Sequence, residues 1–590
     1  MENSRNFVLV LTLSLAVLIG WQWAMDYFYP QPEEVSVTAE KVDTPAEQAE
    51  VAHARTGGLQ DPTAIAQEAA DLETALATPE RVAIDSPRIA GSINLQGAFL
   101  DDVVLKDYAA TTDADDDDPV RIFSPRGTPA QQFSQFGFLV NGQKVSDESL
   151  WSTEGGTLTP DNPVTLTHDA GNGIELQLTY SIDDEYMLTI EQAVANRSAV
   201  PAVVQPYGLV GRTSDTASAD FFIAHSGPMG VFGDSANYDY DYDDIDEAKK
   251  VSPEGAPSWF GFTDIYWLAA MVPQDGATPD ATFRSLGSNI YRADMIYDPV
   301  TVPAGRKYTT TSRLYAGAKE STVLDAYEDA GLAKFGLAID WGWFRWFEKP
   351  FLWLLKNIFE IVGNFGVAII ILTIIVRGLM FPIAQKQFAS MAAMKAIQPK
   401  MKALQERYKD DRVKQQQEMQ KLFKDEKVNP LAGCLPLILQ IPIFFALYKV
   451  LYLAIEMRHQ DFLYIKDLSA PDPATILNLF GLLPFDPPGF LAIGVLAVLL
   501  GLTMWLTFKL NPSTMDPVQQ QVFNIMPWVL MFVMAPFAAG LLLYWVTSNI
   551  LTLAQQKYLY SKHPALRAAA EKEKAEKAAK AAKVELPGRE

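Results

Sequence analysis

The sequence predicts a multi-domain α+β membrane protein, because apolar segments of membrane-spanning length fill its second half and an acidic, strand-like region fills its first. The chain has 590 residues, with 71 acidic and 48 basic side chains and a net charge of -23. Residues 1–340 hold 52 acidic and 20 basic residues, whereas 341–590 hold 19 and 28, so the two parts carry -32 and +9. This asymmetry is expected where a membrane separates two compartments. A salt-adapted surface would also enrich acidic residues.

The N-terminal segment predicts a membrane anchor. Residues 7–23 carry no charge and follow a short head with Arg5. A cleaved signal peptide is the alternative, but no small-x-small site follows. An aromatic belt follows instead, formed by Trp21, Trp23, Tyr27 and Tyr29. We therefore expect a transmembrane anchor at 1–24 with its N-terminus inside, and a flexible tether at 25–81, which is rich in Ala, Glu, Gln and Pro.

Residues 82–334 predict a large all-β domain, because short Val, Ile, Leu, Tyr and Phe runs alternate with Gly, Pro, Asn and Asp clusters. Two acidic runs, at 113–118 and 238–247, suggest calcium. The second, however, has Ile245 where an EF-hand loop needs Gly and Lys250 where it needs Glu. We interpret both runs as solvated loops and expect no metal or cofactor.

The chain has a single cysteine, Cys434, which excludes an internal disulfide framework. The β domain must therefore be stabilised by its core alone. We interpret Cys434 as a small apolar helix residue without a reactive role.

The second half predicts a helical membrane region. Residues 335–360 place four tryptophans among charges, which is typical of an amphipathic helix lying in the membrane interface. Apolar segments near the length of a hydrocarbon core follow at 361–383 and 430–456, and three more lie within 490–557. Together with the anchor, they predict six transmembrane helices.

Loop charges predict the orientation of these spans. Residues 377–430 hold 12 basic and six acidic residues, and residues 557–590 hold nine and five. The loop 457–489, with Glu456 just before it, is acidic, so we place it and the β domain outside and both termini in the cytoplasm.

The cytoplasmic segment 384–429 carries two apolar stripes and predicts a helical hairpin. Its methionines could bind apolar segments, and a coiled-coil seam is the plainer alternative. The basic tail at 558–590 predicts a cationic helix.

Arg377 is the most informative side chain of the predicted spans. A long stem can carry an arginine to the headgroups. The next charge, Lys386, lies nine residues further on, which is roughly 13 Å along a helix. Arg377 therefore lies below the interface, where a charge costs on the order of 3 kcal/mol. The other predicted spans contain no acidic residue, so a water-filled cavity is the expected solvating agent, and Thr373, one turn earlier, supports a polar lining.

Further polar side chains occur in the other spans, namely Gln440, Asn524 and the run Thr547, Ser548 and Asn549. Taken singly, a polar residue of this kind more often forms a hydrogen bond between two helices than lines a groove. Prolines 436 and 442 flank Gln440 and could bend that span. As a set, these residues favour a hydrated interior.

Four stretches give the sequence a specific resemblance: TIIVRGLMFP around Arg377, VNPLAGCLPLILQIPIFFALY at 428–448, NPSTMDPVQQ at 511–520 and GLLLYWVTSN at 540–549. Over roughly residues 340–560 the chain resembles the membrane core of the YidC/Oxa/Alb insertase family. The anchor and outer domain resemble its Gram-negative form, with a supersandwich-like periplasmic domain.

The resemblance implies a substrate groove, open to cytoplasm and lipid, at Arg377, Thr373, Gln440, Tyr544 and Trp545. Many relatives have two tyrosines where this chain has Tyr544 and Trp545, and Trp545 has no hydroxyl to offer.

The resemblance also implies a non-enzymatic insertase and chaperone of the bacterial inner membrane. Its expected partners are nascent membrane proteins, the Sec translocon (SecYEG and SecDF), membrane lipids and the ribosome, reached through the cytoplasmic loops and tail; no DNA partner is expected. A transporter or channel with a charged intramembrane site is the alternative, but the inverted repeat and paired charges of many transporters are missing from the sequence. A membrane-tethered carbohydrate enzyme is a second alternative, although no acid-base pair emerges from the sequence.

Overall fold

The computed structural model describes residues 71–77, 80–112, 118–218, 224–342, 345–409, 411–426, 435–480, 483, 492–510 and 517–562. The chain divides into two compact units, residues 1–56 and 57–590, and every described element belongs to the second unit. The expected anchor, the tether up to residue 70, Cys434 and the tail beyond residue 562 lie outside the described residues. The end of the tether forms a short helix, α3 (Leu72–Leu76).

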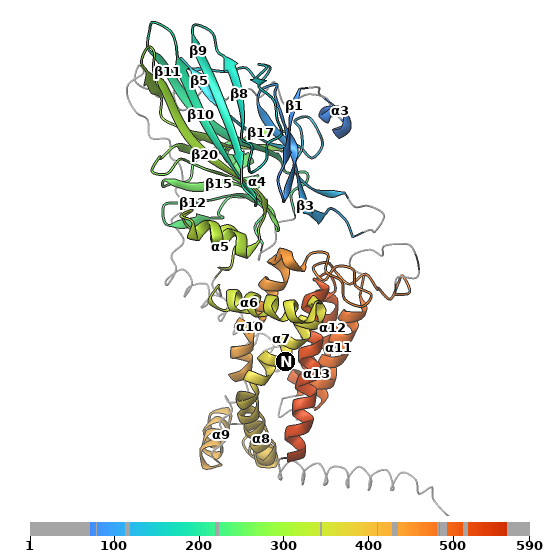
Figure 1. Ribbon diagram of the computed structural model, residues 1–590. Coiled ribbons are helices and arrows are strands. Elements are labelled where there is room, and N and C mark those ends of the chain that lie inside the picture. Colours follow the sequence, from blue (N-terminus) through green and yellow to red (C-terminus); the bar gives the residue numbers. More distant parts are fainter. Residues whose placement is uncertain are drawn as a thin grey trace, which may run out of the picture. The chain divides into compact units, whose positions relative to one another are not determined.

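The all-β prediction is confirmed, because residues 81–318 form two antiparallel sheets, which Figure 1 shows as packed layers. The larger sheet has 11 strands in the order β1-β2-β3-β5-β11-β18-β17-β14, with β4, β6 and β19 paired onto β3, β5 and β11. Its strands are β1 (Arg81–Asp85), β2 (Ile89–Asn94), β3 (Phe99–Ala109), β4 (Pro119–Phe123), β5 (Gln132–Val140), β6 (Gln143–Lys144), β11 (Ala202–Thr213), β14 (Lys250–Val251), β17 (Asp280–Gly287), β18 (Ile290–Ile296) and β19 (Val300–Val302).

The second sheet has nine strands in the order β13-β12-β15-β16-β20-β10-β9-β8-β7. Its strands are β7 (Ser152–Thr153), β8 (Val164–Asp169), β9 (Ile174–Ile182), β10 (Met187–Asn196), β12 (Gly227–Phe232), β13 (Ser235–Asn237), β15 (Pro257–Thr263), β16 (Trp267–Val272) and β20 (Lys307–Ala318). The order is not sequential, since β10 pairs with both β9 and the distant β20.

Strand β9 shows how the sequence builds this sandwich. Its side chains alternate between buried and half-buried along the whole strand. Ile174, Leu176, Leu178 and Ile182 face the core, and the polar residues between them face outward. An alternation of period two is the pattern of a strand with one buried face.

The larger sheet carries a buried ion cluster on its two adjacent strands β17 and β18. Asp294 on β18 is fully buried. One of its carboxylate oxygens lies 2.6 Å from Nε of Arg284, and the other lies 2.6 Å from Nε of Arg292. Both arginines are nearly buried. One carboxylate therefore compensates two guanidinium groups inside the domain.

Residues 242–248, which include the second half of the acidic run at 238–247, form a helix rather than the solvated loop that the sequence predicted. Helix α4 (Tyr242–Ala248) begins with a capping box, in which the Asp241 side chain accepts from the Asp244 N–H and the Asp244 side chain accepts from the Asp241 N–H. Carboxylates at a helix N-terminus satisfy free N–H groups and favour the helix dipole. Much of the acidic character of this run thus serves helix capping.

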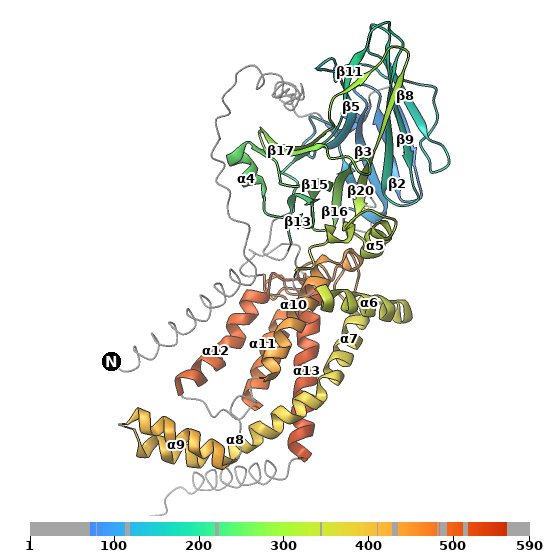
Figure 2. The same cartoon turned by 90° about the vertical axis from the view of Figure 1, so that its left-hand side faces the viewer.

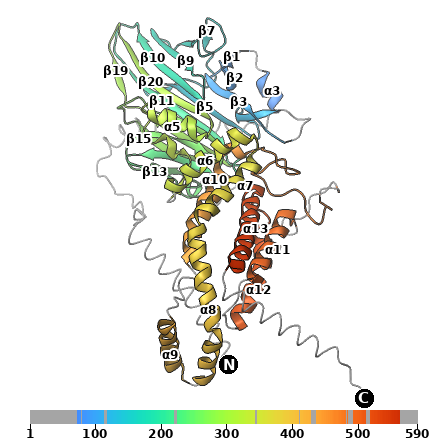
Figure 3. The same ribbon diagram turned by 60° about the horizontal axis from the view of Figure 1, so that its bottom comes forward.

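The elements between residues 321 and 562 are all helices. The elements are α5 (Ser321–Asp329), η2 (Phe335–Ala338), α6 (Arg345–Val362), α7 (Phe365–Leu379), α8 (Phe381–Arg407), α9 (Arg412–Asp425), α10 (Leu435–Leu453), η5 (Ile455–Met457), α11 (Val495–Leu510), α12 (Pro517–Met534) and α13 (Ala539–Lys562). Helix α13 packs against α7, α10 and α11 (Figures 2 and 3). Helices α8 and α9 lie side by side in the segment where the sequence predicts a hairpin.

Helix α6 has two unlike faces. Its buried face includes Leu352, Leu355 and Ile358, at helical spacing. Its other face leaves Trp346 and Trp353 about two-thirds exposed, at 68% and 65%. This amphipathic pattern is the one that the sequence predicts for the interfacial helix at 335–360, but the α-helix begins only at Arg345, and residues 335–338 form the separate short helix η2.

The predicted span at 361–383 is interrupted at Met380, where α7 ends and α8 begins with a bend of 55°. Pro382 lies in the first turn of α8. Proline has no N–H to donate to the carbonyl four residues earlier, and its ring crowds that carbonyl, so a straight helix cannot continue through it.

By length and composition, no single described helix meets the requirements for crossing a membrane alone. The bent pair Phe365–Leu379 and Phe381–Gln387 meets them together. Shorter apolar helices occur at Gln440–Leu453, Val495–Lys509 and Asn524–Met534. The six predicted transmembrane helices therefore stay a prediction.

Candidate functional site

Arg377 lies in the last turn of α7 and reaches across to α13. Its Nε donates to Oγ of Ser548 over 2.8 Å, and its Nη2 donates to the same oxygen. The side-chain amide of Gln555 donates to the Arg377 carbonyl over 3.4 Å. Within the described part of the chain, no carboxylate forms an ion pair with Arg377. The positive charge of this half-buried residue is thus solvated by a neutral hydroxyl.

Gln440 and Tyr544, which come from different helices, are in contact. Nε2 of Gln440 on α10 donates to the Tyr544 hydroxyl on α13 over 3.1 Å. Tyr544 is buried, and Ser548 lies one turn after it on the same helix. The contacts of Gln440 and Arg377 therefore meet on one face of α13, which gives a polar site built from three helices (α7, α10 and α13).

Thr373 and Trp545 make other contacts. The Thr373 hydroxyl is fully buried and donates to the Ile369 carbonyl of its own helix over 2.6 Å. Trp545 packs its ring on Phe444 of α10, with centroids 4.9 Å apart. The structure gives neither residue a hydrogen bond to Arg377, so Thr373 contributes to the helix and Trp545 to the packing of α10 on α13.

Three further polar residues of α13 make contacts: Ser548 and Asn549, which the sequence singled out with Thr547, and Gln555, which it did not. Asn549 donates to the Thr503 hydroxyl of α11 over 3.2 Å, in line with a helix-to-helix hydrogen bond. Ser548 and Gln555 are seven residues apart and share a face with Tyr544. This spacing was the signal in the sequence that could have placed these residues on one face of the helix. Asn524, which sequence analysis did single out, is exposed on α12.

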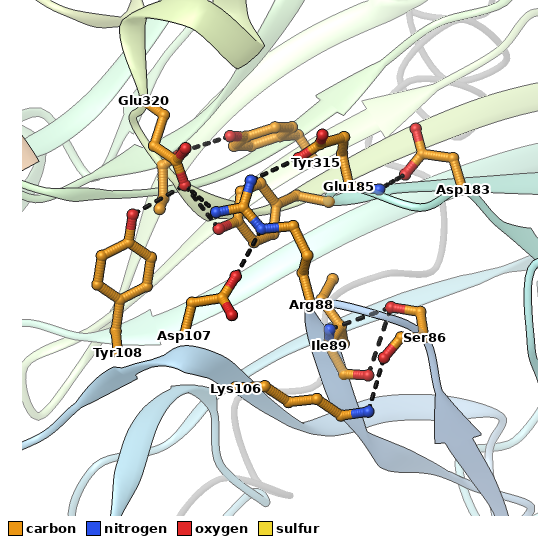
Figure 4. Close-up of polar contacts among 12 residues, drawn as sticks. Ser86, Arg88, Ile89, Lys106, Asp107, Tyr108, Asp183, Glu185, Tyr315 and Glu320 are labelled. Atoms are coloured by element: carbon orange, nitrogen blue, oxygen red, sulfur yellow. Dashed lines mark hydrogen bonds and ion pairs between the residues drawn. The ribbon is translucent and has the colours of Figure 1, made fainter. Parts of the chain in front are cut away.

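A second charged cluster lies in the β-sandwich, around Arg88 (Figure 4). Its guanidinium donates to the carboxylates of Asp107 (2.7 Å), Glu185 (2.5 Å) and Glu320. The hydroxyl of Tyr108 also donates to Glu320, over 2.8 Å. Burial disfavours the charge of Arg88, but the bonds to these carboxylates outweigh it and raise its pKa. The carboxylates share one permanent cation, so the cluster ties the turn before β2, β3, the turn before β10 and the start of α5 together.

All three carboxylates bond to the same arginine, which is the arrangement of a structural link between elements. Within the described residues, no group of three or more His, Cys, Asp or Glu side chains is placed to hold a metal ion.

Two models of known protein families match this chain and define its class. The family model described as "60Kd inner membrane protein" matches residues 357–566, and the model described as "YidC periplasmic domain" matches residues 81–354. The chain is thus an inner-membrane protein whose β-sandwich is a periplasmic domain.

Relatives cover nearly the whole chain. The chain is 42% identical to the membrane protein insertase YidC of Beijerinckia indica, over 95% of this chain and 96% of the relative. It is also 42% identical to that of Zymomonas mobilis, with the same coverage. A crystal structure of an active YidC insertase with its first transmembrane domain resolved covers 82% of this chain and 95% of its own, at 18% identity and a TM-score of 0.33. The chain belongs to the YidC family of membrane protein insertases, which are not enzymes.

Proposed function

We propose that this chain inserts inner-membrane proteins, and helps them to fold, through a hydrated, cytoplasm-open groove built around Arg377. The observation that carries this proposal is that no described carboxylate pairs with the charge of Arg377. Its described side-chain partner is a neutral hydroxyl, Ser548, rather than a carboxylate. A guanidinium without a counter-ion in a low-dielectric region attracts a carboxylate strongly.

The proposed mechanism needs no covalent step. A nascent chain with a short acidic tail enters the groove, and Arg377 attracts that tail part of the way across the membrane. Water in the groove shortens the dry path, which lowers the cost of moving charge through hydrocarbon. The apolar span of the substrate then leaves sideways into lipid. The polar contact between Gln440 and Tyr544 supports this proposal, because it keeps hydrogen-bonding groups beside the path.

The same proposal includes the arrangement in the membrane. Six spans place both termini and the hairpin at 384–429 in the cytoplasm, in accordance with the basic loops. The exposed face of α6, with Trp346 and Trp353, lies in the periplasmic interface and contacts lipid headgroups. The protein works alone or beside the Sec translocon, SecYEG with SecDF. Its basic cytoplasmic segments meet the ribosome by electrostatic attraction.

Replacing Arg377 with alanine tests the charge. Insertion of a substrate with an acidic tail should fall by roughly tenfold, equivalent to about 1.4 kcal/mol, whereas a matched substrate with a neutral tail should change little. Arg377→Lys should restore insertion in part, because lysine keeps the charge but lacks the two-pronged guanidinium. The measurement is insertion into proteoliposomes that contain the purified chain.

Two results would count against the proposed function. Equal insertion of the acidic-tailed substrate by the wild-type and alanine proteins would remove the charge role of Arg377. An ion flux in the same proteoliposomes would favour a channel or transporter.

Photocrosslinking from positions 373, 377, 440 and 545 to a stalled substrate would map the groove directly.

A further inference from the structure

Helix α13 holds residue 377 at two points. Ser548 accepts from the guanidinium, and Gln555 donates to the backbone carbonyl of the same residue. The two contacts come from positions seven residues apart, which lie on one face of a helix. Because α7 ends two residues after Arg377, this carbonyl is among those that lack a partner within their own helix. Both the side chain and the main chain of Arg377 are thus fixed by α13.

The hydrogen bonds to Ser548 select one edge of the guanidinium. Nε and Nη2 form the side edge, and both donate to the single Oγ of Ser548. A hydroxyl oxygen has two lone pairs, so the two N–H groups use its full accepting capacity. Among the described residues, Nη1 has no hydrogen-bond acceptor. The end edge, formed by Nη1 and Nη2, therefore keeps N–H groups in the fork geometry that matches a carboxylate.

We propose that Ser548 is a positioning residue, which holds Arg377 so that the Nη1–Nη2 edge of its guanidinium receives a carboxylate of the substrate tail. This inference rests on the proposed function of Arg377 and adds the residue that orients it. Ser548 is suited to the task because it is 1% exposed and neutral. A buried side chain in one rotamer fixes direction, and a neutral one leaves the arginine charge available to the substrate. An acidic residue at the same place would orient the guanidinium equally well but would neutralise it.

The test separates orientation from general stability by varying the charge of the substrate. Insertion is measured for one substrate with tails of zero, one and two acidic residues, using full-length protein in proteoliposomes. The dependence of insertion on tail charge reports on the arginine. The level reached with the neutral tail reports on the integrity of the protein.

Ser548→Ala should weaken the dependence on tail charge by roughly threefold, because the hydrogen bond contributes only part of the effect of the arginine, and should leave neutral-tail insertion unchanged. Ser548→Thr keeps a hydroxyl and should restore the dependence. Ser548→Asp should abolish it, because an ion pair with Arg377 would occupy the charge. Thr507→Ala is the matched control, since that hydroxyl also lies in an apolar helix but donates only to the Thr503 carbonyl, over 2.8 Å. This control should behave as wild type.

Four outcomes would overturn the inference. Ser548→Ala could lower insertion of all tails by one common factor, which is the result of a purely structural role. It could also leave the charge dependence intact while Arg377→Ala removes it, in which case the proposed function stands and the role of Ser548 falls. If Ser548→Ala does not accumulate, Ser548→Asp decides, because retention of the charge dependence by that variant contradicts the geometry. Persistence of the dependence in Arg377→Ala would remove the proposed function itself, and the inference with it.

Discussion

Replacing Asp294 with alanine should destabilise the β-sandwich by about 3–5 kcal/mol, the cost of leaving a buried charge without its partner. Arg284 and Arg292 would both keep their guanidinium groups inside the domain, where they are 8% and 6% exposed as residues. An arginine side chain stays charged inside a protein, so neutralisation cannot relieve the penalty. The loss of one carboxylate therefore affects two cations.

The free energy of unfolding of the sandwich can be measured by resistance to proteolysis in increasing urea, on the full-length protein in detergent. Asp275→Ala is the control, since its carboxylate also pairs with an arginine, Arg313, over 2.9 Å but is 89% exposed. Exposed pairs contribute roughly 0–1 kcal/mol. Similar small changes in both variants would show that the buried cluster does not stabilise the domain.

Replacing Glu348 with glutamine should remove a pH dependence from the packing of α6. Glu348 is fully buried, and neither carboxylate oxygen has a hydrogen-bond partner among the described residues. Burial raises its pKa to about 8, and Asp340 adds to this effect while Lys449 opposes it. Lys449 is itself bound to Asp340, with Nζ 3.0 Å from the carboxylate and 2.7 Å from the carbonyl.

The sign of the effect follows from the raised pKa. The folded protein binds the Glu348 proton more tightly than the unfolded chain, whose pKa is about 4.5. The stabilisation is complete below about pH 4.5 and is lost as the pH rises through about 8. Wild-type stability should therefore decline across this window relative to Glu348→Gln, by on the order of 5 kcal/mol at pH 9.

Thermal unfolding midpoints of the detergent-solubilised protein between pH 4 and pH 9.5 check this prediction. Each variant is compared with wild type, so the titration of other groups cancels. Glu360→Gln removes an exposed carboxyl from the same helix and should follow wild type at every pH. Parallel curves for wild type and Glu348→Gln would contradict a raised pKa at Glu348.

The architecture of the β domain was predictable because its strands have local signals. The alternation of IELQLTYSI appears in the structure as the alternating burial of β9. The order of the strands was not predictable, since pairing partners such as β10 and β20 lie more than 100 residues apart and their register depends on the whole core. The helix at 242–248 was missed because Asp241 and Asp244 form a cap, and a cap is hard to distinguish from a loop in an acidic run.

The candidate site was predictable only as far as single residues. Arg377 stood out because a charge in an apolar segment is costly. Its partner Ser548 lies 171 residues further along the chain, and no local pattern links the two. The direction of the Thr373 hydroxyl was also undetermined by sequence, because a threonine within a helix can bond to its own backbone or face a neighbour.

The polar contacts of α13 also bear on the order in which the protein assembles during its own synthesis. Arg377 on α7, Gln440 on α10 and Thr503 on α11 all find side-chain partners on α13, and α13 follows the three of them in the chain. A chain is made from its N-terminus. The native hydrogen bonds of these three residues therefore cannot form until residues 539–562 have been translated. Until then the nascent chain carries an arginine inside an apolar segment without its partner. Insertion of this protein into the membrane is therefore itself energetically costly until α13 has been made.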